Sequence, residues 1–334
     1  MIDLSFIWAT IIALGILIYV VLDGFDLGIG ILFPFFKDET DRNVLMNTIA
    51  PVWDGNETWM VLGGAGLFAA FPLVYSAVLS ALYMPVILMV IFLIFRGVAF
   101  EFRFKANRTK HLWDLSFILG STIATFLQGV ILGAYIQGIN IQDGRYVGGG
   151  FDWLTPFSLF CGVAVIVAYA TLACGWLIIK TTDELQINMY KLMPRLILIL
   201  LTMFGVVSLW TPFTHPDVAE RWFSTPNIYY FSFVPLLVLY CAYKAIRAST
   251  LRRQLTPFIA TLGLVLLAYI GFLISLWPMI VPPSITIWEA AAPEGSQLFT
   301  LIGALLLIPI ILTYTGLSYW VFRGKVRADD EGYH

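Results

Sequence analysis

Residues 5–22 read SFIWATIIALGILIYVVL, an apolar run without a charged residue. A helix rises about 1.5 Å per residue, so a run of this length nearly crosses the roughly 30 Å of hydrocarbon in a bilayer. After Asp23 and Asp26 the apolar sequence resumes and continues to Phe36, which leaves open whether one long tilted helix or a span with an interfacial piece forms there. Similar runs predict nine spans in all, near residues 5–25, 53–71, 75–98, 115–138, 157–179, 196–213, 228–246, 256–278 and 298–322.

The composition excludes a water-soluble enzyme. Of 334 residues, 60% are hydrophobic and 12% are charged, against roughly 25% charged residues in ordinary soluble domains. The mean hydropathy is +0.86. We therefore expect an all-α integral membrane protein in which residues 1–334 form a single polytopic transmembrane domain, and we expect no nucleic-acid partner.

The positions of the basic residues support this span count. If the N-terminus is outside, all but three of the 19 Lys and Arg residues fall on the cytoplasmic side. Arg145 and Arg221 fall in outer loops, and Arg96 lies at the inner end of the third span. This asymmetry is the one that the positive-inside rule describes. We therefore expect a periplasmic N-terminus and a cytoplasmic C-terminus.

The sequence offers few groups that could ligate a metal or haem. A membrane redox protein usually holds haem with His side chains that project into a helix bundle. His111 lies in a basic inner loop, His215 in an outer loop, and His334 is the last residue. We expect no haem ligand in this chain. We also expect no metal site, because no C-x-x-C pair is formed by the three cysteines, Cys161, Cys174 and Cys241.

The first polar feature is residues 23–30, which read DGFDLGIG. Asp23 and Asp26 are three residues apart and share one helical face, and Gly24 and Gly28 would let another helix approach closely. Carboxylates inside a span are costly and commonly mark ion or proton paths. The alternative is that both acids lie at the inner membrane surface as solvated or capping groups.

Two further polar features lie toward the same predicted face of the membrane. Asp54 and Glu57 open the second span, where they could admit protons or could form a capping box at the helix start. Arg96 could extend to the lipid headgroups or pair with one of these acids. A shared polar cluster of Asp23, Asp26, Asp54, Glu57 and Arg96 is therefore plausible, and these residues are our proton-pathway candidates.

Four stretches stand out in combination: DGFDLG at 23–28, IAPVWDGNETW at 49–59, FAAFPLVY at 68–75 and Phe95-Arg96. Together they resemble subunit II of the cytochrome bd quinol oxidases, and at this length the shorter, cyanide-insensitive branch. The second stretch is highly specific, and the likeness extends into the outer loop at 278–289. Where other members tend to have Trp-Asp-Ala followed by serines, this chain departs and reads WEAAAPEGS at 288–296.

The resemblance implies a heterodimeric oxidase of the bacterial inner membrane that oxidises quinol, reduces dioxygen to water and generates a proton motive force. It implies two four-helix bundles plus one peripheral helix. It assigns haems b558, b595 and d to the large partner subunit, and it leaves room for a small accessory subunit and, in this chain, a structural quinone. It implies that Asp54, Asp23 and Arg96 take part in the supply of protons.

Two other functions remain open from the residues alone. A proton-coupled membrane transporter also needs acids within its spans, but it would be expected to show paired interrupted helices near the membrane midplane, with a substrate site between repeats. A passive scaffold would use the same polar residues only to cap and orient helices. An oxidase subunit differs from both because it should purify with a haem-bearing partner.

Overall fold

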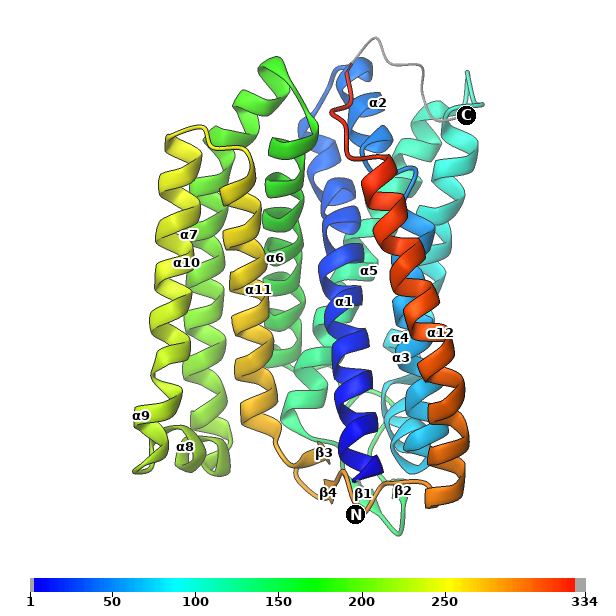
Figure 1. Ribbon diagram of the computed structural model, residues 1–334, viewed down its shortest axis with the longest axis vertical. Coiled ribbons are helices and arrows are strands. Elements are labelled where there is room, and N and C mark those ends of the chain that lie inside the picture. The colour runs from blue at the N-terminus through cyan, green and yellow to red at the C-terminus, as the bar shows by residue number, and fades with distance from the viewer. Residues whose placement is uncertain (1–2, 328–334) are drawn as a thin grey trace.

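Long helices running nearly parallel to one another make up the structure, a computed structural model that describes residues 3–327 (Figure 1). Apolar side chains dominate these helices on all sides, as expected for segments that face lipid or one another. The long helices are α1 (Leu4–Leu32), α3 (Trp53–Ala70), α4 (Pro72–Arg103), α5 (Lys110–Gln137), α6 (Pro156–Lys180), α7 (Asp183–Thr214), α10 (Phe233–Thr250), α11 (Leu255–Leu276) and α12 (Glu294–Val321).

The long helices form two groups of four. Helices α1, α3, α4 and α5 pack together, α6, α7, α10 and α11 form the second bundle, and α12 lies peripherally against α3 and α1. The bundles meet where α6 packs on α1 and α5. The predicted arrangement of two four-helix bundles plus one peripheral helix is therefore confirmed.

Short elements close the two ends of the molecule. One end, which we call the strand end, carries the start of α1, two β-hairpins and the short helices α8 and α9. The opposite end, which we call the α2 end, carries helix α2 (Figure 1). The short elements are η1 (Phe33–Phe35), α2 (Glu39–Asn47), β1 (Ile141–Gln142), β2 (Arg145–Tyr146), α8 (Pro216–Phe223), α9 (Asn227–Phe231), β3 (Met279–Val281) and β4 (Ile285–Thr286). Each hairpin is antiparallel, with Ile141 opposite Tyr146 and Met279 opposite Thr286.

Glycines allow α1 to approach α6 closely. A Cβ atom at Gly28 would collide with the backbone carbonyl of Tyr169, and one at Gly24 would lie 2.9 Å from the Tyr169 ring. The predicted small-residue contact is therefore present, and its partner is α6. This contact holds residues 23–28 of α1 in the interior of the molecule.

Several predicted boundaries differ from those observed. The first apolar run forms one long helix, α1, that ends in the η1 turn. The span predicted at 196–213 belongs to a helix that begins at Asp183, because its first turns are polar but still helical. Within residues 3–327, eight helical segments are long and apolar enough to cross a membrane. Helix α3 is not among them, so a ninth crossing stays a prediction.

Candidate functional site

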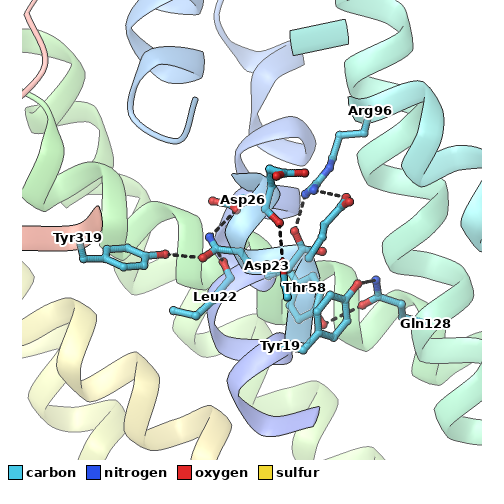
Figure 2. A network of polar contacts seen from close by, with 12 residues as sticks. Tyr19, Leu22, Asp23, Asp26, Thr58, Arg96, Gln128 and Tyr319 are labelled. Atoms are coloured by element: carbon cyan, nitrogen blue, oxygen red, sulfur yellow. Dashed lines mark hydrogen bonds and ion pairs between the residues drawn. The ribbon is translucent and has the colours of Figure 1, made fainter. Parts of the chain in front are cut away.

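Arg96 of α4 occupies the interior of the first bundle and joins two acids from different helices. Its Nη1 atom lies 2.6 Å from Asp23 Oδ1 of α1, and its Nη2 atom pairs with Glu57 Oε1 of α3 (Figure 2). The side chains of Arg96 and Asp23 are fully buried, and that of Glu57 is 25% exposed. The interpretation in which Arg96 extends to the headgroups is therefore wrong. The Arg96 guanidinium also faces the ring of Trp53, 5.7 Å from its centroid.

Asp26 forms a second branch that ends on the peripheral helix. Asn56 Nδ2 donates to Asp26 Oδ2 at 2.7 Å, and the Tyr319 hydroxyl of α12 donates to Asn56 Oδ1 at 3.0 Å (Figure 2). Asp26 has no exposed surface, and Asn56 has 1%. Because Asp23 and Asp26 are both buried, the interpretation that placed them at the membrane surface is wrong.

A neutral polar group adjoins the cluster on the side of α5 and α6. Gln128 Nε2 donates to the Tyr19 hydroxyl at 2.7 Å, and the Tyr169 hydroxyl donates to Gln128 Oε1 at 2.8 Å. Tyr19 precedes Asp23 by one helical turn of α1, so these side chains lie directly beside the acids (Figure 2). They tie α1 to both neighbouring helices with hydrogen bonds instead of charge.

Asp54 stands apart from the other candidates. Its side chain is exposed on the first turn of α3, and the residue before that helix, Val52, makes no side-chain capping hydrogen bond. The capping-box interpretation is therefore wrong, because Glu57 turns inward to Arg96 instead of back to the helix start. The structure thus brings together Asp23, Asp26, Glu57 and Arg96, and it leaves Asp54 at the edge of this group.

Sequence reasoning missed the partners that α12 and α5 supply. Tyr319 is 263 positions from Asn56 in the chain. The sequence around residue 319 does not indicate that its hydroxyl bonds to a buried polar group. A tyrosine at the end of an apolar span reads as an interfacial anchor. Gln128 carried a clearer signal, because an amide in the middle of a predicted span needs a partner.

A separate charged group fixes the loops of the α2 end. Arg103 is fully buried; its Nε atom pairs with Asp114, and its Nη1 atom donates to Asn43 of α2 at 2.7 Å. Lys110 forms an ion pair with Glu39, and the hydrogen bond between them lowers the pKa of that exposed carboxyl. These contacts attach α2 to α4 and α5, and they do not reach the buried acids around Arg96.

The described histidines do not fit a haem. His111 is exposed in the first turn of α5, and His215 is half-buried at the junction of α7 and α8, outside the middle of either helix. His334 lies outside the described residues. Among residues 3–327, no group of three or more His, Cys, Asp or Glu side chains could hold a metal ion.

The fold and the site together define a polytopic helical membrane protein that encloses ionisable side chains in one bundle. The sequence profile described as cytochrome bd terminal oxidase subunit II matches residues 4–322. The chain belongs to this family. It is thus a subunit of a terminal oxidase, a multi-pass protein of a bacterial inner membrane whose complex contains haem and a large partner subunit.

Individual relatives agree with this assignment over almost the whole chain. The chain is 28% identical to cytochrome bd-I ubiquinol oxidase subunit 2 of Escherichia coli K12, over 98% of this chain and 96% of the relative. It is 29% identical to the cytochrome bd ubiquinol oxidase subunit 2 of Bacillus subtilis, over 97% and 96%. A chain of the bd oxidase structure from Geobacillus thermodenitrificans has the same fold, with a TM-score of 0.81 and 16% identity over 96% of this chain and 99% of that one. None of these matches favours a transporter.

Proposed function

We propose that this chain supplies protons from the cytoplasm to an oxidase that transfers electrons from quinol to dioxygen, while the large subunit holds haems b558, b595 and d. The chain supports that subunit and ligates no haem itself, in keeping with the positions of His111 and His215. In the same proposal, the complex contacts membrane lipid and quinol and includes a small accessory subunit. This chain holds a structural quinone. The N-terminus is periplasmic and the C-terminus cytoplasmic.

The observation that carries the proposal is the buried cluster of three carboxyls around one guanidinium. Arg96 pairs with Asp23 and Glu57, and Asn56 donates to the third carboxyl, Asp26. The single positive charge of Arg96 balances only one carboxylate. Burying each further carboxylate without a cation costs roughly several kcal/mol. A bound proton on one of the three carboxyls avoids part of this cost. Asp23 Oδ2 and Asp26 Oδ1 have no hydrogen-bond partner among the described residues, which leaves an acceptor oxygen on each.

The exposure of these side chains suggests an order for proton entry. Asp54 is exposed, Glu57 is partly exposed, and Asp23 and Asp26 are fully buried. The cluster lies in the half of α1 nearer α2, toward the end where the positive-inside rule expects the cytoplasm. Protons would therefore pass from Asp54 to Glu57, and then past Arg96 to the aspartates.

This route explains how such an enzyme can build a transmembrane potential without a pump. Reducing one dioxygen to two waters takes up four electrons and four protons by stoichiometry. If the protons come from the cytoplasm and quinol releases its own protons on the other side, each turnover separates charge. A carboxyl group can accept a proton on one oxygen and release it from the other, which suits Glu57 to this task.

We predict that Glu57→Gln slows quinol oxidation by dioxygen by about tenfold or more, because an amide does not exchange a proton as a carboxyl does. Gln keeps the length of the side chain and can still accept a hydrogen bond from Arg96, so the complex should assemble with its full haem content. Turnover and haem spectra of the purified complex check both expectations.

Glu101→Gln is the matched control. Glu101 lies on the exposed surface of α4, near Lys105 and away from the cluster, so its neutralisation should leave turnover unchanged. Wild-type turnover in Glu57→Gln with intact haem would contradict the assignment of Glu57 as the inlet.

A further inference from the structure

Asn56 is held in one orientation between the buried acids and the peripheral helix. Its Nδ2 atom lies 2.7 Å from Asp26 Oδ2 and 3.5 Å from the Leu22 carbonyl oxygen, both of which are acceptors. The amide therefore cannot turn round without facing its own oxygen toward these acceptors. Its Oδ1 atom must point to Tyr319, whose hydroxyl donates to it at 3.0 Å. The hydrogen bonds thus run in one direction, from Tyr319 through Asn56 to Asp26.

A small cavity lies on the other side of Asn56. It sits between the start of α3 and the last turns of α12, and it leaves about 10 Å³ for the centre of a water molecule, room for roughly one water. The Thr315 hydroxyl lines it, and its oxygen is buried without a hydrogen-bond partner among the described residues. Tyr314, also in the lining, is exposed, so the cavity borders the outside of the chain.

A carboxamide continues a hydrogen-bond chain but does not continue a proton path. Water, hydroxyl and carboxyl groups can accept a proton at one position and release another, whereas a carboxamide would have to pass through an unstable imidic acid. Asn56 is the side chain that joins the cavity lining to Asp26. A polar cavity with space for water therefore approaches a buried acid closely, and a group that cannot relay protons separates them.

We propose that Asn56 is a proton barrier and a positioning residue. It fixes Asp26 with a donor on Oδ2, and it prevents proton exchange between Asp26 and the cavity beside α12. Asp26 Oδ1, which has no partner among the described residues, is then the oxygen that takes up a proton within the cluster. This inference rests on the proposed function, in which protons reach the aspartates from the Glu57 side.

Asn56→Asp in the assembled oxidase tests the barrier, since it replaces the amide by a carboxyl of nearly equal size. Infrared spectra after transfer to D₂O follow hydrogen–deuterium exchange at the carboxyl band that Asp26→Asn removes. We expect exchange at least about tenfold faster in Asn56→Asp than in the wild type. Equal exchange rates would overturn the proposal. If Asn56→Asp does not assemble, Asn56→Ser provides a hydroxyl that can also relay protons. Faster exchange would then support the proposal, and equal exchange would overturn it.

Gln297→Glu is the matched control for this conversion. Gln297 is a buried amide at the opposite end of α12, 2% exposed and hydrogen-bonded to Ala292. Its conversion to an acid should leave exchange at Asp26 at the wild-type rate. Faster exchange in this control would show that any added acid loosens α12, and it would overturn the specific assignment of Asn56.

A combined variant separates this inference from the proposed function. If Glu57→Gln closes the inlet, adding Asn56→Asp should open a second one and raise turnover at least about threefold above that of Glu57→Gln alone. No recovery in an assembled double variant would count against the barrier. Wild-type turnover in Glu57→Gln alone would instead refute Glu57 as inlet, while the exchange measurement would still decide the role of Asn56.

Discussion

Arg96 is the residue on which the charge balance of the cluster depends. Its guanidinium is fully buried and ion-paired with Asp23 and Glu57. A buried ion pair adds little net stability compared with an apolar pair of the same shape, but removing one partner leaves an uncompensated charge. The Arg96 side chain therefore matters most through what its loss would leave behind.

We predict that Arg96→Leu destabilises the assembled complex by about 3–5 kcal/mol, because Asp23 loses its buried cation. Adding Asp23→Leu to this variant should recover much of the loss, since the pair is then replaced by apolar side chains. Thermal unfolding midpoints and haem content of the single and double variants measure the difference. A double variant no more stable than Arg96→Leu alone would contradict this account of the pair.

The sequence predicted the acids of the cluster better than their neutral partners. Charged residues within apolar spans or at their ends are conspicuous, and this signal predicts Asp23, Glu57 and Arg96 as candidates. Asn56 lay in the same motif, but its role depends on Tyr319, which is distant in the chain. A tyrosine carries no comparable signal, because in a span it can equally be an apolar packing residue or an interfacial anchor.

At the scale of elements, the packing of α1 on α6 determines where the acids lie. Gly24 and Gly28 face Tyr169, whose hydroxyl belongs to the Gln128 group. The same helix surface therefore provides both the close contact and the polar lining. A separation of these helices would expose the acids and break the hydrogen bonds at Gln128.

We predict that Gly28→Ala destabilises the complex by about 1–3 kcal/mol, because the added Cβ would overlap the Tyr169 backbone. Backbone atoms, unlike a side chain, cannot rotate out of the way. The control is Gly64→Ala on α3, where no heavy atom lies within 4 Å of the added Cβ. Unfolding midpoints of the two purified variants check this. Equal midpoints would mean that α1 and α6 are not held at this distance.

Helix boundaries show where sequence patterns reach their limit. The long helices were predicted from apolar runs, but α7 extends into polar sequence from Asp183, which hydropathy cannot detect. At α3 the spacing of Asp54 and Glu57 matched a capping box, yet pairing of Glu57 with Arg96 overrides that local pattern. A tertiary contact with Arg96 therefore decides the role of Glu57.

At the scale of the whole molecule, the segment after α12 connects the peripheral helix to the second bundle. Val326 N–H donates to the Lys180 carbonyl at 2.8 Å, and the Lys325 ammonium donates to the Thr181 carbonyl at 2.8 Å. The Lys180 side chain in turn donates to the Phe322 carbonyl. These contacts lie at the end of α6, so they hold α12, and with it Tyr319, in place.

The orientation of the molecule in the membrane gives a further prediction. Gly150→Cys, in the loop between α5 and α6, and Gln254→Cys, in the loop between α10 and α11, should react with an impermeant thiol reagent from opposite sides. Both positions are exposed, and the positive-inside rule places the first outside and the second in the cytoplasm. Labelling of both from the same side would undo the assignment of the cluster to the cytoplasmic half.

Proton uptake from the cytoplasmic side tests the central claim most directly. In oxidase reduced by quinol and then mixed with dioxygen, a pH-sensitive dye should report uptake at least about tenfold slower in Asp23→Asn than in the wild type. Haem content and haem reduction by quinol should be unchanged, because Asn can still accept a hydrogen bond from Arg96. Uptake at the wild-type rate in a fully assembled Asp23→Asn complex would contradict the claim that this cluster carries the protons.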